Sequence, residues 1–460
     1  MSRISLKENS EKKLQKKTIK EGISTVQSKL ANMKNNPIWV KEDTLRKCVH
    51  NLRKKKNYDR SDRESLFLLG KSLEILDTKS QVVKGYLQFS CVKPMIHIMM
   101  TEGQILAYNE LKYKDKILHL DATGGLVSTK FSYGRRIYYY ALVFKSTQNK
   151  ILPLTEMITS RHGTEDIRKM FSEIEYQFLK VTNKQLEINQ LVVDYSFALI
   201  KGFLNNFELS TLPQYINKLW NKEETKSRLI LCKSHAMKSL SRSVNSKFSK
   251  ENNKKYHKLI MAALSEILYS KDHNELKTKF EMICILFCSK FKTPKLTETI
   301  QKFANTDFND FEYSDNDEVN IESNSEWNQM APGRLFNSIF IWSQNKISNY
   351  ESMCNKNSNT ALRENPLYNI EFMHYFVVHY MAIVPLWSNI SGDLLTNGNI
   401  ESWFNIVKKR IGKPTPNTSP CDVIKELNKL ILERTCDYTF IKENVRRKKI
   451  MIDEEKWKNQ

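Results

Sequence analysis

Two short apolar runs, each ended by an aspartate, constrain the fold of this chain most strongly. Ile117 to Leu120 precede Asp121 in KILHLDATGG, and Leu191 to Val193 precede Asp194 in NQLVVDYSFAL. Branched apolar runs of this length, bounded by turn-prone residues, are typical of buried strands. Each acid therefore lies at a strand end, where burial of an unpaired carboxylate is unfavourable. A divalent cation is the simplest partner for two such carboxylates.

A third acid, Glu401, lies in NGNIESWFNIVKKR, which has helical periodicity. The apolar positions that recur at helical spacing are Ile400, Trp403, Phe404 and Val407. Glu401, Asn405 and Lys408 fall together on another face of this helix. That face can direct a carboxylate and a cation towards a bound phosphate, while Trp403 belongs to the core.

The size and charge of the chain favour a large polyanionic partner. Its 460 residues are enough for two or three domains, and 73 basic against 51 acidic side chains give a formal net charge of +22. Neutralising phosphates releases condensed counterions, so nucleic acid is the leading candidate. Residues 1–50 alone hold 12 basic and 5 acidic side chains.

Two basic clusters lie towards the ends of the chain. RKKK covers Arg53, Lys54, Lys55 and Lys56, and RRKK covers Arg446 to Lys449. Each is either a nuclear import signal or a phosphate-binding arm, and a solvated helix face is the alternative. Lys408, Lys409 and Arg410 form a third cluster after Glu401. We expect these clusters to contact DNA.

The sequence favours an intracellular protein, with the nucleus as the expected compartment. The Lys-rich N-terminus has no apolar segment of the kind found in signal peptides, and no apolar run approaches the length of a membrane span. The eight cysteines have no regular spacing, which favours reduced thiols. We expect neither a membrane nor a small-molecule substrate as partner.

The pattern of elements predicts a mixed α/β fold with a helical insertion. We expect strands over KILHLDAT, RRIYYYALVFK and KILPLTEMIT, a helix from Thr164, the Asp194 strand, a helix through 198–207 and a short strand at 228–232. The predicted regions are a basic arm (1–60), a helical accessory region (61–115), the first part of the core (116–235), a helical insertion (236–395) with an acidic loop (303–333), the Glu401 helix (396–411) and a basic helical tail (412–460).

This order of elements, with acids on the first strand, after the fourth strand and on a late helix, resembles the RNase H-like catalytic domain of DDE transposases and retroviral integrases. Within that group the chain most resembles Mutator-like cut-and-paste transposases. The residues that carry the resemblance are LHLDATGG, VVDYSFA, Cys232 and His235 in LCKSHAMK, and NGNIESWFNIVKK. It covers roughly residues 85 to 411, and the N-terminal zinc-dependent module of many relatives has no counterpart here.

The resemblance implies that Asp121, Asp194 and Glu401 hold two Mg²⁺ or Mn²⁺ ions. One ion would activate water or a DNA 3′-hydroxyl, and the other would stabilise the leaving oxygen. It also implies double-stranded DNA as substrate and self-association on that DNA. The alternative is that each acid is an ordinary surface or strand-end carboxylate.

Cys232 and His235 allow more than one interpretation. The resemblance implies that they order a DNA-facing loop. They could also form half of a zinc site, which only Cys284 and Cys288 in MICILFCSK could complete. Burial of those two thiols as small apolar side chains is the favoured interpretation.

Other aromatic and histidine residues have simpler interpretations. His162 in SRHGTED precedes a helix, where it either approaches a phosphate or serves as a turn residue. Tyr138, Tyr139 and Tyr140 lie in a predicted central strand, where successive side chains point to opposite faces. The tyrosines on at least one face therefore belong to the core.

Two functions therefore stand from sequence. The leading one is a DDE-type transposase that cleaves and rejoins DNA. The other is a catalytically idle, transposase-derived DNA-binding or regulatory protein. An RNase H-type nuclease directed at RNA hybrids is weaker, since it would not need the insertion.

Overall fold

The computed structural model describes residues 82–305 except 133, 338–356, 363–392, 395–412, 415 and 418–435, with Leu66, Leu69 and Gly70. The predicted basic arm, with Arg53 to Lys56, lies outside the described residues. So do the RRKK cluster and the acidic loop from residue 306 onwards.

Seven strands form one mixed sheet in the order β1-β2-β5-β4-β3-β6-β7. The strands are β1 (Leu87–Val92), β2 (Met95–Met99), β3 (Ile117–Gly124), β4 (Tyr138–Lys145), β5 (Ile151–Thr159), β6 (Gln190–Val193) and β7 (Arg228–Leu231). Neighbours from β1 to β3 pair antiparallel, whereas β3, β6 and β7 pair parallel. The predicted α/β class and the meander of three consecutive strands are confirmed.

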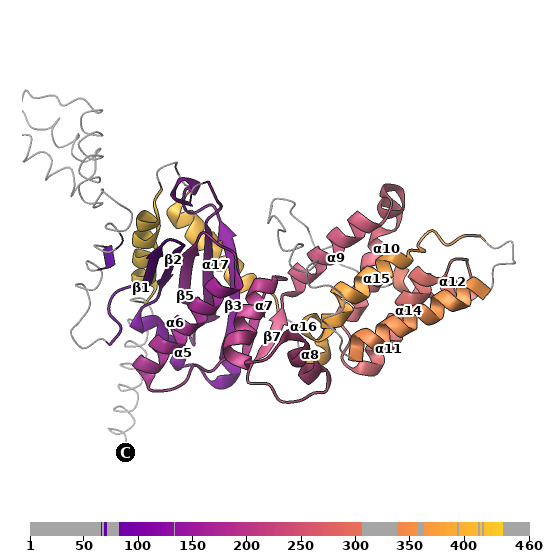
Figure 1. Ribbon diagram of the computed structural model, residues 1–460, viewed down its shortest axis with the longest axis horizontal. Coiled ribbons are helices and arrows are strands. Elements are labelled where there is room, and N and C mark those ends of the chain that lie inside the picture. Colours follow the sequence, from indigo (N-terminus) through magenta and orange to yellow (C-terminus); the bar gives the residue numbers. More distant parts are fainter. Residues whose placement is uncertain are drawn as a thin grey trace, which may run out of the picture.

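Both faces of the sheet are covered, which explains why its strands are apolar on both sides. Along β4, Tyr140 and Phe144 face one core, while Tyr139 and Val143 face the other. The first core contains side chains of α5 (Glu102–Asn109), α6 (Thr164–Thr182) and α7 (Phe197–Phe203). The second contains α17 (Gly398–Ile411) and a helix over 420–435. Figure 1 shows α5 and α6 on one side of the sheet and α17 on the other.

The sheet begins earlier in the chain than the sequence predicts. The helical prediction over 61–115 is wrong for residues 87–99, which form the hairpin of β1 and β2. β2 pairs with β5, so this hairpin extends the central sheet. The helical spacing that supported the prediction lies among the leucines of 66–76 and does not extend into the hairpin. Part of the region is helical, namely α5 and the short η1 (Tyr113–Asp115).

Before β7, α7 is followed by η3 (Leu204–Glu208) and α8 (Leu212–Trp220). Between β7 and α17 helices dominate the chain, as the sequence predicts. The insertion contains α9 (Lys233–Lys247), α10 (Lys250–Leu268), α11 (His273–Cys288), α12 (Pro294–Ala304), α14 (Ser338–Lys356), α15 (Ile370–His379), η5 (Met381–Ile383), α16 (Val384–Trp387) and η6 (Asn389–Ser391).

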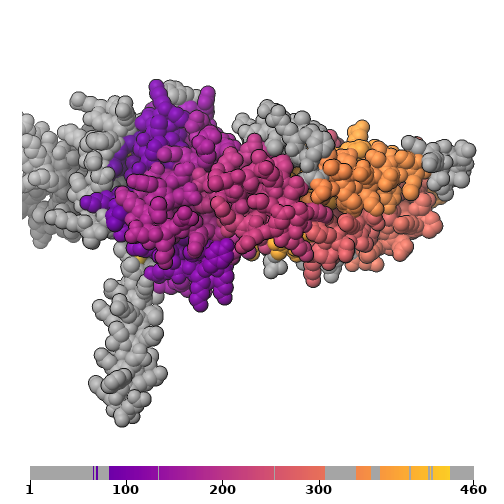
Figure 2. Space-filling model, turned by 60° about the horizontal axis from the view of Figure 1, so that its bottom comes forward, coloured from indigo at the N-terminus to yellow at the C-terminus, as the bar shows by residue number. Residues whose placement is uncertain are grey.

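The insertion continues the core of the sheet. One buried cluster runs from the α5 and α6 face of the sheet through α7, α8 and β7 into α10, α11 and α15. Figures 1 and 2 show an elongated molecule, with the sheet at one end and α10 to α15 at the other. The insertion is therefore packed onto the sheet through a shared apolar core.

One segment is more apolar than the sequence analysis allowed. By length and composition, Ile370–Ser391 could cross a membrane, with a mean hydropathy of 1.2, so the expectation of no such run is wrong. In the structure 67% of this window is buried inside the protein. It comprises α15, η5, α16 and η6, and packing in the shared core accounts for its apolar character.

Candidate functional site

The parallel pairing of β3 and β6 brings the two predicted aspartates together. Leu120 pairs with Val193, so Asp121 and Asp194 follow each other across neighbouring strands. The leucine and the valine face the α5 and α6 core, and the next residue in each strand points to the opposite face. The two carboxyl groups therefore lie side by side where the parallel pairing of β3 and β6 ends. Asp194 directly follows β6, as predicted, but Asp121 lies within β3 and pairs with Ala141, so the prediction that it ends a strand is wrong.

The environment of this pair favours a single negative charge. Asp121 is buried, and the Ala122 N–H donates to its Oδ1 at 2.7 Å. Burial raises the pKa of Asp194 to about 7, although a hydrogen bond with the Asp121 side chain opposes the rise. Two adjacent carboxylates cannot both be ionised cheaply, because each disfavours the charge of the other. One proton shared between them, or a cation, satisfies the pair.

One oxygen of this pair has no partner among the described residues. Asp194 is half-buried as a residue, but its Oδ1 is fully buried and accepts no hydrogen bond from any described residue. A buried carboxylate oxygen left in this way is costly. An oxygen ligand held without a protein donor suits a hard divalent cation.

The third acid does not join the pair in this structure. Glu401 lies in the first turn of α17 and is exposed. Among the described residues, no group of three or more His, Cys, Asp or Glu side chains is placed so that it could hold a metal ion. The residues present therefore fit a cation at Asp121 and Asp194, and Glu401 would have to turn inward to complete the site.

Helix α17 nevertheless runs alongside the strand that carries Asp121. At its start, the Asn399 Nδ2 donates to His119 Nε2 at 3.0 Å, and His119 Nδ1 is 3.4 Å from Asn397 Oδ1. Burial lowers the pKa of His119 to about 4, so the ring is neutral and can donate through one nitrogen and accept through the other. Because His119 and Asp121 share a face of β3, this contact places the start of α17 beside the acids.

A second anchor fixes α17 two residues beyond Glu401. Trp403 is fully buried, and its Nε1 donates to the Tyr139 hydroxyl at 2.9 Å. The Tyr139 and Tyr86 hydroxyls in turn donate to the two oxygens of Glu156. Glu156 lies on β5, is fully buried, and burial raises its pKa to about 7. Through these contacts α17 is connected to β4, to β5 and to Tyr86, which directly precedes β1.

A tyrosine, a histidine and a serine line the same edge of the sheet. The Tyr140 hydroxyl is hydrogen-bonded to His162 Nδ1, and His162 Nε2 is 3.2 Å from Ser196 Oγ. The rings of Tyr140 and His162 stack with centroids 5.9 Å apart. Burial and then the charge of Asp194 raise the pKa of Tyr140, which shows that its hydroxyl lies close to the aspartates.

The contacts of His162 with Tyr140 and Ser196 go beyond what the sequence pattern predicts. His162 is more than a turn residue, since it connects β4 with the segment after β6. The prediction that Tyr139 and Tyr140 belong to the core is confirmed, because both are fully buried. His119, Asn397 and Glu156 were also missed. The one available signal was the alternation in LHLD, which puts His119 on the face of Asp121.

Cys232 has a structural role that connects β7 with α17. Its N–H donates to Val193 O at 2.7 Å, and its Sγ accepts from the Asn397 N–H at 3.2 Å. This contact favours the interpretation that Cys232 orders a loop. His235 follows in the first turn of α9.

The proposed completion of a zinc site does not occur among the described residues. Cys284 and Cys288 are buried in α11 of the insertion, in the apolar environment expected from their neighbours. No described group of metal-ligating side chains includes them.

The basic cluster after Glu401 divides into two parts. Lys408 and Lys409 are exposed in the last turn of α17. Arg410 is instead paired with the helix over 420–435, with Nη2 2.6 Å from Glu433 Oε1 and Nε 3.7 Å from Glu426 Oε2. Arg410 is thus exposed like its neighbours but forms surface ion pairs, whereas Lys408 and Lys409 have none with a described carboxylate.

No protein-family model matches the chain, and no curated protein matches its sequence significantly.

Proposed function

We propose that the protein is a metal-dependent DNA nuclease of the DDE transposase type, built on an RNase H-like core. The observation that carries the proposal is the Asp121 and Asp194 pair, side by side on β3 and after β6, with a buried Asp194 Oδ1 that no described residue satisfies. The strand order supports it, since an antiparallel meander followed by two parallel strands is the arrangement that the sequence resemblance implies.

Asp121 and Asp194 would hold the cation, and Glu401 would complete its ligands after a side-chain rotation. A bound pair of Mg²⁺ or Mn²⁺ ions supplies a nucleophile at neutral pH and stabilises the leaving oxygen of the phosphate. The protein contributes the dry edge of the sheet and two fixed carboxylates. The anchors at His119 and Trp403 hold the turn of α17 that carries Glu401 against the sheet, because they bond Asn399 and Trp403 on either side of it.

The duplex would be held mainly by phosphate contacts. Lys408 and Lys409 are exposed on the helix that carries Glu401, and the net charge of +22 favours a polyanion. Self-association on DNA and a nuclear location belong to the same proposal and follow from the resemblance.

A catalytically idle DNA-binding protein is the second candidate. It is favoured by one observation, namely that Glu401 is exposed and that no three-acid group is formed among the described residues.

Nicking of labelled duplex DNA separates the two candidates. Purified wild-type protein and Asp194→Asn are compared with Mg²⁺, with Mn²⁺ and with chelator. The nuclease predicts cleavage that needs the metal and is lost in the variant, while DNA binding is kept. Equal nicking by both proteins would reject the assignment of the site, and binding without nicking in both would favour the idle protein.

A further inference from the structure

The helical insertion carries a dense basic segment directly after β7. Between residues 233 and 258 there are eight Lys or Arg and one acidic residue, Glu251. Seven of these cations form what we call the α9–α10 basic surface: Lys238, Arg242, Lys247, Lys250, Lys254, Lys255 and Lys258. All are exposed except Lys238, which is half-buried.

No carboxylate of a described residue neutralises the charges of this surface. None of the seven cations forms an ion pair with a carboxylate of a described residue, nor does Glu251. The spacing places Lys238 and Arg242 one turn apart on α9, and Lys254 and Lys258 one turn apart on α10. Like charges at this spacing repel each other, so the arrangement costs stability unless an anion is bound.

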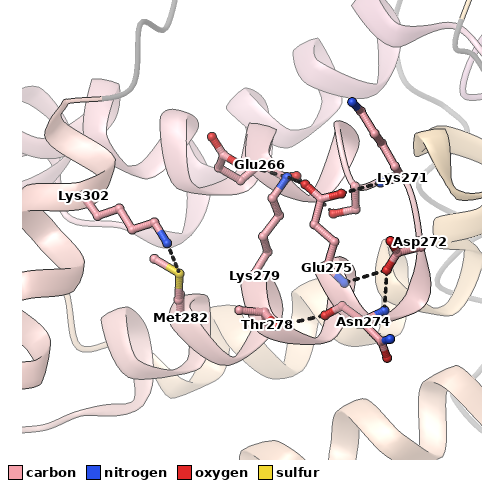
Figure 3. Close-up of polar contacts among 10 residues, drawn as sticks. Glu266, Lys271, Asp272, Asn274, Glu275, Thr278, Lys279, Met282 and Lys302 are labelled. Carbon is pink, nitrogen blue, oxygen red and sulfur yellow. Dashed lines mark hydrogen bonds and ion pairs between the residues drawn. The ribbon is translucent and has the colours of Figure 1, made fainter.

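Another part of the same insertion shows the opposite arrangement. Lys279 of α11 is 2.7 Å from Glu275 Oε1 and 3.1 Å from Glu266 Oε2, as Figure 3 shows. Lys346 of α14 is likewise paired with Glu281. Among the described residues of the insertion, Lys279 and Lys346 thus have carboxylate partners, whereas the seven cations of the α9–α10 basic surface have none.

The basic surface is rigidly attached to the edge that carries the acids. The Lys233 N–H at the start of α9 donates to Leu395 O, in the segment that leads to α17. Ser239 and Ser243 of α9 each bond the Tyr380 hydroxyl at 2.9 Å, and Ser241 is 3.2 Å from His257 of α10. These hydrogen bonds connect α9 with α10, with Tyr380 and with the segment before α17.

The direction of α9 fits a duplex that leaves the candidate site. Figure 1 shows α9 running from β7 away from the sheet and towards α10. At 1.5 Å per residue, a helix of 15 residues is about 22 Å long, which matches roughly six base pairs of duplex.

We propose that the α9–α10 basic surface binds the phosphate backbone of duplex DNA that extends from the Asp121 and Asp194 edge. Lysines and an arginine without carboxylate partners recognise backbone charge rather than base sequence. The inference rests on the proposed function for the identity of the duplex as substrate, but it concerns binding and needs no cleavage.

The test compares two variants that each lose four positive charges. The first is Lys238→Gln, Arg242→Gln, Lys254→Gln and Lys258→Gln on the basic surface. The control is Lys271→Gln, Lys277→Gln, Lys292→Gln and Lys295→Gln, at exposed positions from the end of α10 to the start of α12. Binding of labelled mixed-sequence duplex is measured by anisotropy in chelator, between about 50 and 200 mM salt.

The basic-surface variant should bind at least about tenfold more weakly, and its plot of log affinity against log salt should flatten by roughly 2 to 4 units. The control should change that slope by less than about 1 unit. Equal effects in the two variants, or no effect in either, would overturn the proposal. So would tight binding of polyglutamate to the wild type together with unchanged duplex binding by the first variant, since the surface would then serve an acidic peptide.

Folding and catalysis are separated from this readout. Thermal melting identifies a variant that fails to fold, and in that event Arg242→Gln and Lys258→Gln are measured singly. If the salt dependence of binding flattens in the basic-surface variant but the wild type does not nick DNA, the binding surface is supported and the proposed nuclease is rejected. If the wild type nicks DNA but the salt dependence is unchanged in that variant, the nuclease is supported and the binding surface is rejected.

Discussion

The strand edge and helix α17 position their acids in different ways. Asp121 and Asp194 are placed by backbone pairing, because the register of β3 and β6 leaves them no other location. Glu401 depends on side-chain anchors at His119 and Trp403, and its own carboxylate is exposed. Two parts of the candidate site are therefore positioned by the sheet itself, whereas the third depends on how a helix packs against the sheet.

The largest expected effect comes from the acids themselves. Asp194→Asn and Glu401→Gln should each lower the cleavage rate roughly a thousandfold, since metal-assisted charge stabilisation is worth several kcal/mol and about 1.4 kcal/mol is tenfold.

The two variants should differ in how Mn²⁺ changes their melting temperature. Mn²⁺ should raise the melting temperature of the wild type and of Glu401→Gln, but not that of Asp194→Asn, because the metal binds chiefly at the strand edge. Scanning calorimetry with and without Mn²⁺ measures the difference. Full cleavage by Glu401→Gln would show that Glu401 is not needed for cleavage and that only Asp121 and Asp194 belong to the site.

A smaller effect is expected from the Trp403 anchor. Trp403→Phe keeps most of the apolar contact but loses the hydrogen bond to Tyr139, so the free energy of unfolding should fall by about 1 to 2 kcal/mol. Cleavage should also fall, because Glu401 is held less firmly, while the Mn²⁺-induced rise in melting temperature should persist.

Trp220→Phe is the matched control for Trp403. Trp220 packs against His273 in the insertion, away from α17. A similar loss of cleavage in this control would show that the effect arises from general destabilisation rather than from the position of Glu401.

The smallest effect is expected at Glu156, beneath α17. Its pKa in the folded protein is about 7, above the 4.5 of an unperturbed Glu, so the folded state binds the proton more tightly between these values. The stability that the protonated form provides is fully present below about pH 4.5 and is lost as pH rises to about 7.

Glu156→Gln should remove this dependence on pH. Relative to the wild type, the variant should be more stable at pH 8 than at pH 5, as measured by urea unfolding at both values. Tyr86→Phe, which removes one hydrogen-bond donor and leaves the carboxyl group, should retain the pH dependence. Parallel wild-type and Gln curves would show that Glu156 does not titrate in this range.

Much of the fold could be predicted because local patterns and tertiary structure agree in the sheet. The short branched apolar runs before Asp121 and Asp194, bounded by turn-prone residues, favour strands, and the helical spacing from Ile400 to Val407 favours α17. The hairpin of β1 and β2 was missed because its partner β5 lies some 60 residues away in sequence, and pairing over that distance leaves no local pattern.

The sequence by itself determined most element types from β3 onwards, the position of Asp194 directly after a strand and the basic character of the chain. Each depends on residue type and short-range period, which a sequence states directly. Only the tertiary structure decided that Asp121 and Asp194 share a proton-binding environment, that Arg410 is paired and Lys408 exposed, and that His162 joins Tyr140 to Ser196. The physical reason is that burial and hydrogen bonding depend on neighbours distant in the chain.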